Sequence, residues 1–238
     1  MVDMNVLAAA NAKRWANAKV TRNVSGIAKA LVDAKPRYQA VEKASGVPWW
    51  AIAVIHARES SQNWRRSLAQ GDPIDKISVH VPAGRGPFPD WESAAIDALV
   101  HCPPHLARKK DWSVGVALAS LEAYNGVGYA ARGKPSPYLW AGTDQYTSGK
   151  YVRDGLYDPD HVDAQPGCAG MLKAMMTLDP SIKLETSKTS TTKKASGSVV
   201  AGGAAATAAQ QAGLSIGWII AIGVAVAAAT FVIWKLKK

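Results

Sequence analysis

Apolar residues recur with helical spacing along most of the chain before residue 186. This pattern predicts six helices, over residues 6–19, 24–34, 47–61, 91–101, 112–124 and 167–178. Pro48 suits the first turn of the third helix, and Asp90 and Asp111 suit the N-cap positions of the fourth and fifth helices. The helical spacing is interrupted over residues 71–89, where alternation at 77–81 predicts one short strand between loops. The chain is therefore expected to contain a mainly α domain with a small loop and β wing.

The C-terminal part of the chain has a composition unlike that of the helical part. Residues 214–234 carry no charge, and Trp218 and Trp234 stand near the two ends of this run. About 20 apolar residues cross a bilayer as a helix, and Trp is enriched at the two membrane interfaces. Residues 186–213 consist mainly of Ser, Thr, Lys, Ala and Gly, without an aromatic residue, which is typical of a flexible linker. The sequence predicts one C-terminal transmembrane helix, with the lipid bilayer as its partner.

The charge distribution separates the same two parts of the chain. All 18 acidic residues lie at or before Glu185, whereas six of the 28 basic residues lie beyond it. The basic residues before Glu185 are scattered, so nucleic acid is not an expected partner. The five histidines show no metal-ligand spacing, and neither a metal nor another cofactor is expected. Cys102 and Cys168 either form a disulfide or are two buried thiols.

Glu59 is the strongest candidate for a chemical role. Its spacing places it on the apolar face of the predicted helix over residues 47–61, close to the C-terminal end. Apolar surroundings and the partial negative charge of a helix C-terminus both raise the pKa of a carboxyl group. A carboxyl group that stays protonated near neutral pH can act as a general acid. The alternative is an ion pair between Glu59 and Arg58, Arg65 or Arg66.

Three stretches, in order along the chain, carry a family resemblance. Residues 56–73 (HARESSQNWRRSLAQGDP) contain a Glu-Ser pair at a helix end, followed by a Gly-Asp-Pro loop. Residues 79–99 (VHVPAGRGPFPDWESAAIDAL) look like a wing and its following helix, and residues 121–155 (LEAYNGVGYAARGKPSPYLWAGTDQYTSGKYVRDG) contain a Tyr-Asn-Gly turn. Together they resemble the lysozyme-like superfamily of peptidoglycan-cleaving enzymes, which includes phage and bacterial lysozyme-family proteins and lytic transglycosylases. The resemblance covers about residues 45–175.

The resemblance implies a lysozyme-like catalytic domain over residues 46–185. Residues 1–45 are expected to form an N-terminal helical arm, and the alternative is that they complete the catalytic domain. It implies that Glu59 protonates the leaving oxygen when the β-1,4 bond between N-acetylmuramic acid and N-acetylglucosamine is cut. An inverting muramidase also needs a second carboxylate that activates water, and Asp72 is the candidate for this role. The alternative for Asp72 is a structural role in a turn. Lytic transglycosylases need no second carboxylate, but the chain lacks the Gly-Leu-Met-Gln stretch that often follows their catalytic Glu.

Aromatic residues are concentrated between residues 124 and 151. Sugar rings pack on aromatic rings while their hydroxyl groups bind polar side chains, so this composition suits a glycan groove. The alternative is that most of these rings belong to the core. Two or three are expected to face substrate, Tyr124 and Tyr129 first. The expected substrate-binding residues are Ser60, Tyr124, Asn125, Gly126, Tyr129, Tyr138 and Gln145.

The sequence as a whole indicates a membrane-tethered peptidoglycan hydrolase, a muramidase that belongs to a phage lysin, a virion or a bacterial envelope. Its expected partners are peptidoglycan strands and a membrane, either the bacterial inner membrane or a virion membrane. One alternative is a lytic transglycosylase that leaves anhydro-muramic ends. Another is a catalytically inactive glycan-binding or structural module. An ion-paired Glu59 would favour that module, whereas a desolvated Glu59 in an open groove would favour an enzyme.

Overall fold

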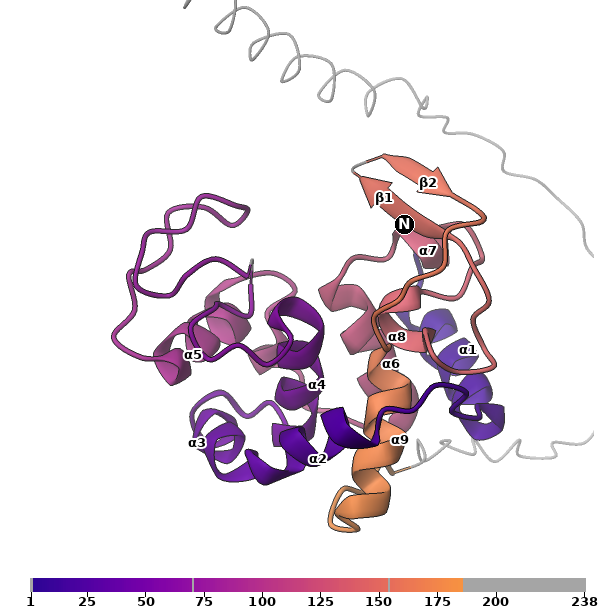
Figure 1. Cartoon of the computed structure of the whole chain (residues 1–238), viewed down its shortest axis with the longest axis horizontal. Coiled ribbons are helices and arrows are strands. Elements are labelled where there is room, and N and C mark those ends of the chain that lie inside the picture. Colours follow the sequence, from indigo (N-terminus) through magenta and orange to yellow (C-terminus); the bar gives the residue numbers. More distant parts are fainter. Residues whose placement is uncertain (1, 70, 154, 186–238) are drawn as a thin grey trace, which may run out of the picture. The chain divides into compact units, whose positions relative to one another are not determined.

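The computed structural model describes residues 2–69, 71–153 and 155–185. This part of the chain is mainly helical, as the apolar pattern predicts (Figure 1). Its elements are, in chain order, α1 (Met4–Asn17), α2 (Ser25–Asp33), α3 (Lys35–Ser45), α4 (Trp49–Ser60), α5 (Trp91–His101), the 3₁₀ helix η1 (Leu106–Arg108), α6 (Val114–Tyr124), α7 (Gly128–Ala131), α8 (Pro137–Trp140), β1 (Lys150–Arg153), β2 (Leu156–Asp158) and α9 (Cys168–Leu178). Strands β1 and β2 form an antiparallel hairpin in which Tyr151 pairs with Tyr157.

The six predicted helices correspond to α1, α2, α4, α5, α6 and α9, with bounds that differ by no more than two residues. Asp90 is the N-cap of α5, as predicted, because its side chain accepts a hydrogen bond from the backbone N–H of Ser93 at 2.7 Å. Pro48 stands one position before α4, as its N-cap. The predicted N-cap role of Asp111 is wrong. The N-cap of α6 is Ser113, and Asp111 orders the preceding turn by accepting the backbone N–H of Ser113 at 2.8 Å.

The predicted strand over residues 77–81 is also wrong. This segment is part of the loop that joins α4 to α5, and Val79 and Val81 are 78% and 88% exposed. The loop is closed by its own backbone, because the N–H of Ser78 donates to the carbonyl of Arg85 at 2.8 Å. A strand needs a neighbouring strand to satisfy its backbone groups, and within the described part of the chain none lies beside this segment. The described part of the chain has its strands elsewhere, in the β1–β2 hairpin, which the apolar pattern did not predict.

Helix α3 is absent from the prediction because most of its positions are polar. Its buried side chains, Tyr38, Val41 and Ser45, form one narrow stripe at helical spacing. A proline in the first turn begins the helix, and Gly46 ends it in a left-handed conformation with φ +74°. Contacts with α4 and α5 cover the stripe, so this helix depends on tertiary packing more than on its own sequence pattern.

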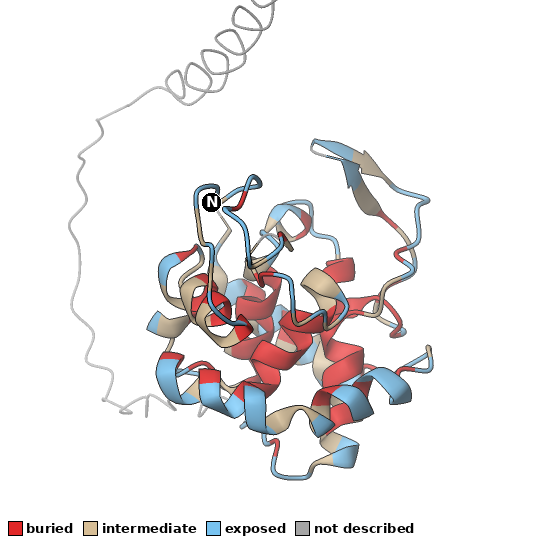
Figure 2. Cartoon of the chain, turned by 60° about the vertical axis from the view of Figure 1, so that its left-hand side comes forward, coloured by how far each residue is buried: buried red, intermediate tan, exposed pale blue. Residues whose placement is uncertain are grey.

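The first three helices belong to the same compact unit as the rest of the described domain. α1 packs against α6, α2 against α9, and α3 against α4 and α5. Leu7 on α1 and Leu31 on α2 are buried, and Figure 2 shows the buried positions gathered where the helices face one another. Residues 1–45 therefore pack in the same unit as residues 46–185, as in the alternative in which they complete the domain. Removal of residues 1–45 would expose apolar surface on α4, α6 and α9.

Helix α4 lies in the core and carries the candidate acid near its end. Every residue from Trp49 to Ala57 is buried, and α4 contacts α2, α3, α6 and α9. A helix that is buried on all sides is apolar around its whole circumference, which explains the sequence WWAIAVI. Burial becomes partial at Arg58, Glu59 and Ser60. The core thus holds α4 in place and leaves its last turn near the surface of the domain.

The predicted linker over residues 186–213 and the predicted transmembrane helix over residues 214–234 lie outside the described residues. Among the helices that the structure describes, none has the length and apolar character needed to span a membrane. Cys102 and Cys168 are both free and buried. Of the two alternatives drawn from the sequence, they are therefore two buried thiols.

Candidate active site

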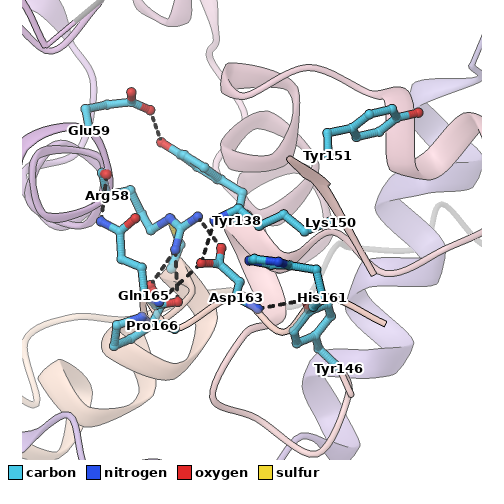
Figure 3. Close-up of polar contacts among 12 residues, drawn as sticks. Arg58, Glu59, Tyr138, Tyr146, Lys150, Tyr151, His161, Asp163, Gln165 and Pro166 are labelled. Atoms are coloured by element: carbon cyan, nitrogen blue, oxygen red, sulfur yellow. Dashed lines mark hydrogen bonds and ion pairs between the residues drawn. The ribbon is translucent and has the colours of Figure 1, made fainter. Parts of the chain in front are cut away.

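Glu59 lies in the last turn of α4 and is half-buried. The helix ends at Ser60, and Ser61 adopts a left-handed conformation with φ 53° that redirects the chain. Tyr138, from the short helix α8, donates a hydrogen bond from its hydroxyl group to Glu59 Oε1 at 2.8 Å (Figure 3). Tyr138 is itself buried, with 2% of its surface exposed. Two helices far apart in the sequence therefore bring the carboxyl group and its hydrogen-bond donor together.

The basic residues near Glu59 in the sequence form other interactions. Arg58 Nη2 lies 3.0 Å from Asp163 Oδ2, and Arg58 Nη1 donates to two backbone carbonyls in the loop before α9 (Figure 3). Arg66 donates to a backbone carbonyl in the loop after α4. Within the described ranges, no Lys or Arg forms an ion pair with Glu59. The ion-paired alternative for Glu59 is therefore not observed.

Burial raises the pKa of Glu59 from its ordinary value of 4.5 to about 7. The hydrogen bond from Tyr138 and the charge of Arg58 both favour the ionised form and lower this pKa, but burial outweighs them. A substantial fraction of Glu59 is therefore protonated at neutral pH, whereas an exposed Glu is almost entirely ionised. A carboxyl group in this state can give its proton to a leaving oxygen.

Asp163 is the buried anion that binds Arg58. Its side chain is 2% exposed, and it accepts hydrogen bonds from Arg58 at 3.0 Å and from Lys150 Nζ at 2.9 Å. Burial raises the pKa of Asp163, but the two cations lower it by more, so the pKa is below its ordinary value. Tyr146 Oη accepts the backbone N–H of Asp163 at 3.1 Å (Figure 3). The cluster connects the end of α4 to strand β1. Its members are up to 105 positions apart, beyond what sequence periodicity can reveal.

A pocket of about 400 Å³ lies beside Tyr138, a volume within the range of small-molecule sites. Four of the predicted substrate-binding residues, Asn125, Gly126, Tyr129 and Tyr138, line it. Glu59 is not part of the lining but is joined to it through the hydrogen bond from Tyr138. The other lining residues are Arg58, Gly128, Pro137, Lys150, Tyr151, Arg153, Gly155 and Asp163.

An aromatic cluster forms one wall of this pocket. Tyr129 packs edge-on against Tyr151 and Tyr157, with ring centroids 5.1 and 6.3 Å away. Tyr129 Oη also accepts the backbone N–H of Tyr151 at 2.9 Å, and Arg132 Nε donates to Tyr151 Oη at 2.7 Å. Because Tyr129 is only 5% exposed, its main contribution is to hold the β1–β2 hairpin against α7. The contributions of Tyr157 and Arg132 depend on the fold of the hairpin and are not evident from the sequence.

Three predicted substrate-binding residues do not line the pocket. Ser60 donates its hydroxyl group to a backbone carbonyl of its own helix at 3.2 Å. Gln145 donates to the side chain of the residue before it at 3.0 Å. Tyr124 donates to a backbone carbonyl of the loop after α4 at 3.2 Å. Burial and the charge of Glu59 raise the pKa of Tyr124 well above its ordinary value, so Tyr124 lies near the candidate acid although it is outside the pocket.

Asp72 lies in the loop between α4 and α5, and its carboxylate is engaged there. Oδ2 accepts the backbone N–H groups of Val79 and His80 at 2.9 and 3.1 Å, and Oδ1 lies 2.6 Å from His80 Nδ1. The hydrogen bonds from His80, and then that from Val79, lower the pKa of Asp72. The preceding residue, Gly71, lies close to the end of α4, because a Cβ atom at this position would be 3.3 Å from the backbone carbonyl oxygen of Glu59. These contacts agree with the structural alternative for Asp72, in which it fixes the conformation of the loop.

Among the described residues, no group of three or more His, Cys, Asp or Glu side chains is arranged to hold a metal ion. Comparison of the chain with protein-family models, curated proteins and solved structures gives no match. The fold and the site together describe a helical domain with one half-buried, protonatable carboxyl group beside a polar and aromatic pocket.

Proposed function

We propose that this protein cleaves the β-1,4 bond between N-acetylmuramic acid and N-acetylglucosamine in peptidoglycan, with Glu59 as the general acid. The observation that carries the proposal is the state of the Glu59 carboxyl group. Burial raises its pKa to about 7, it has no cationic partner in the described part of the chain, and Tyr138 connects it to a pocket of about 400 Å³. The resemblance of three stretches to the lysozyme-like superfamily supports peptidoglycan as the substrate.

In the proposed reaction, protonated Glu59 transfers its proton to the glycosidic oxygen as the bond to the anomeric carbon breaks. Tyr138 donates to Oε1, which leaves Oε2 to carry the proton. The same hydrogen bond and the positive charge of Arg58 favour the carboxylate, so both stabilise the anion that forms when the proton leaves. Burial raises the pKa of Tyr138 well above its ordinary value, and its hydroxyl group therefore remains a donor throughout the working pH range.

The residues that line the pocket suit a polar, ring-shaped substrate. Asn125 and Gly126 come from the turn after α6, and Tyr151 comes from the hairpin. Asn125 is exposed, so its amide is free to bind an N-acetyl group or a hydroxyl group of the sugar. The ring of Tyr151 offers an apolar face on which a sugar can pack. A non-catalytic module has no need of a Glu with a raised pKa, whereas a general acid requires it.

A lytic transglycosylase is the second candidate, and the contacts of Asp72 favour it. Both oxygens of Asp72 are engaged in holding the loop, so they are poorly placed to activate water as an inverting muramidase requires. Asp163, which lines the pocket, is neutralised by Arg58 and Lys150. In a transglycosylase a hydroxyl group of the muramic acid attacks in place of water, and no second carboxylate is needed.

The test is the digestion of purified peptidoglycan by the full chain near pH 6, followed by mass spectrometry of the soluble fragments. Reducing muramic ends would identify a muramidase, and anhydro-muramic ends would identify a transglycosylase. Glu59→Gln should release no fragments, whereas the matched variant Glu42→Gln, on α3 and outside the lining of the pocket, should behave like the unmodified chain. Absence of fragments from the unmodified chain, with its fold shown to be intact, would overturn the proposal in favour of a glycan-binding module.

We further propose that the enzyme is held at a membrane by the predicted transmembrane helix over residues 214–234. A membrane anchor keeps the enzyme at the membrane-facing side of the cell wall and raises its local concentration there. Lysines on both sides of the anchor can also bind anionic lipid headgroups. The full chain should therefore sediment with vesicles, and a chain that ends at residue 185 should not.

A further inference from the structure

The charged residues that line the candidate active-site pocket are mostly cations. Among the described lining residues, Arg58, Lys150 and Arg153 are positive and Asp163 is negative, which leaves a net charge of +2. Both oxygens of Asp163 already accept hydrogen bonds, Oδ2 from Arg58 at 3.0 Å and Oδ1 from Lys150 and from the backbone N–H of Gln165 at 2.9 and 3.2 Å. The pocket therefore favours a ligand that carries a negative charge.

Lys150 extends from strand β1 towards Asp163 (Figure 3). Its ammonium group has three N–H donors, and the bond to Asp163 Oδ1 is its single hydrogen bond within the described ranges. The Lys150 side chain is 34% exposed. Two donors thus remain for a ligand in the pocket while Lys150 still holds Asp163.

A bulge in strand β1 brings a second cation to the same face of the hairpin. Lys150 lies opposite Asp158 and Arg153 lies opposite Leu156, so β1 contains one extra residue, Val152. In a regular strand, residues three positions apart point to opposite faces, but one extra residue puts them on the same face. Lys150 and Arg153 therefore share a face. Arg153 is exposed, and no ion pair or hydrogen bond of its guanidinium group occurs in the described part of the chain.

Asp158 is the acidic residue opposite Lys150 on strand β2. Its Oδ1 accepts the backbone N–H groups of Asp160 and His161 at 2.9 and 3.2 Å, so its carboxylate is engaged with the chain that follows β2. Asp158 does not line the pocket. Among the described lining residues, Asp163 is thus the single acid that opposes the three cations.

We propose that Lys150 and Arg153 bind a carboxylate carried by the muramic acid residue of the glycan, and that they thereby determine which of its two alternating β-1,4 bonds is cut. This inference rests on the proposed function. N-acetylglucosamine is uncharged, whereas N-acetylmuramic acid carries a lactyl group that ends either in a free carboxylate or in a peptide with carboxylates of its own. A guanidinium group is well suited to a carboxylate, and the ammonium group of Lys150 adds a second positive charge.

The position of the two cations in the same pocket as Tyr138 connects this recognition to the reaction. Tyr138 lines the pocket and donates to Glu59 Oε1 at 2.8 Å. A muramic acid residue held by its carboxylate beside Tyr138 places its own glycosidic bond, and not that of the uncharged sugar, next to the candidate acid. The two kinds of sugar in the strand otherwise have the same ring and the same linkage, so the carboxylate is the feature that can set the register.

The first test measures binding to the full chain by NMR titration with three probes. N-acetylmuramic acid carries the free lactyl carboxylate, its methyl ester has nearly the same shape without the charge, and muramyl dipeptide carries its carboxylate on the peptide. N-acetylmuramic acid or muramyl dipeptide should bind about five- to tenfold more tightly than the methyl ester, and the difference should shrink in about 0.5 M NaCl. Preference for the first identifies the lactyl carboxylate as the ligand, and preference for the second identifies a carboxylate of the peptide.

Three variants assign the preference to particular residues. Arg153→Gln and Lys150→Gln should each weaken the binding of the charged probe about two- to threefold and leave the methyl ester unaffected. Arg108→Gln removes the same charge from η1, outside the pocket lining, and should change the binding of no probe. In digestion of peptidoglycan, Arg153→Gln should raise KM more than it lowers kcat and should release some fragments with reducing N-acetylglucosamine ends.

Three results would overturn this inference. The first is the absence of saturable binding of every probe at millimolar concentrations, the second is equal affinity for the charged probes and the methyl ester, and the third is a preference that survives Arg153→Gln and Lys150→Gln unchanged. The binding measurements need no cleavage, so a chain that prefers the charged probe but releases no fragments would refute the proposed reaction and support the recognition. If Lys150→Gln fails to fold because Asp163 loses a partner, Arg153→Gln still decides the matter, since Arg153 is exposed.

Discussion

Replacement of Glu59 by Gln is expected to make the protein more stable above pH 7 while it abolishes glycan cleavage. Burial holds the pKa of Glu59 at about 7 in the folded protein, whereas its ordinary value is 4.5. The folded state therefore binds more protons than the unfolded state between these two values, and the free energy of unfolding falls as the pH rises through this window. A Gln side chain does not ionise, so the variant escapes this loss.

The magnitude follows from the size of the pKa shift. A shift from 4.5 to about 7 corresponds to about 3 kcal/mol at about 1.4 kcal/mol per pH unit. The stabilising protonated form is fully present below pH 4.5 and is lost once the pH exceeds about 7. Gln has nearly the same shape as Glu, and its amide oxygen can still accept the hydrogen bond from Tyr138. The substitution thus removes the ionisation and preserves the contact.

The assay is urea unfolding of the full chain and of Glu59→Gln at pH 5 and pH 8, followed by tryptophan fluorescence. The variant should exceed the unmodified chain by about 3 kcal/mol at pH 8 and by much less at pH 5. Its cleavage rate should fall by at least about 100-fold at both pH values, the typical contribution of a general acid. Stability gained together with activity lost is the expected sign of a functional residue held in an unfavourable environment.

One result would refute this reasoning. If the difference in unfolding free energy between Glu59→Gln and the unmodified chain is the same at pH 5 and pH 8, the pKa of Glu59 is not raised in the folded state. The carboxyl group would then be ionised at neutral pH, and it could not be the general acid.

The remaining predictions concern Glu59, its partner Tyr138, and the two buried acids Asp72 and Asp163. The cleavage rate of the unmodified chain should fall about tenfold per pH unit above pH 7, as Glu59 loses its proton. In Tyr138→Phe this decline should begin at higher pH, because the lost hydrogen bond lowered the pKa of Glu59; a decline at unchanged or lower pH would contradict the assignment. Asp72→Asn should make the loop between α4 and α5 more sensitive to proteolysis and reduce cleavage only mildly, whereas a loss of cleavage with an intact loop would restore its role in water activation. Asp163→Ala should lower the free energy of unfolding by about 3–5 kcal/mol in urea titrations, since it leaves two cations unpaired; a neutral effect would mean that the cluster is solvated.

Much of the helical framework could be predicted from the sequence, because helix formation depends on spacings of three and four residues. The bounds of α1, α2, α4, α5, α6 and α9 are within two residues of the apolar pattern. The same short-range argument places Glu59 on the apolar face at the end of α4, and it correctly predicts the N-cap Asp90. It fails for α3, whose apolar stripe is too narrow, and for residues 77–81, where alternation occurs without a partner strand.

Only the tertiary structure decided which groups surround Glu59. Arg58 was an equally good partner by sequence, but it binds Asp163, 105 positions away, and Glu59 receives a hydrogen bond from Tyr138, 79 positions away. Likewise, only the structure shows that both carboxylate oxygens of Asp72 are hydrogen-bonded within the loop between α4 and α5. The physical reason is that a pKa and a hydrogen-bond partner depend on neighbours in space, and the choice among several suitable charges is made when distant segments pack together.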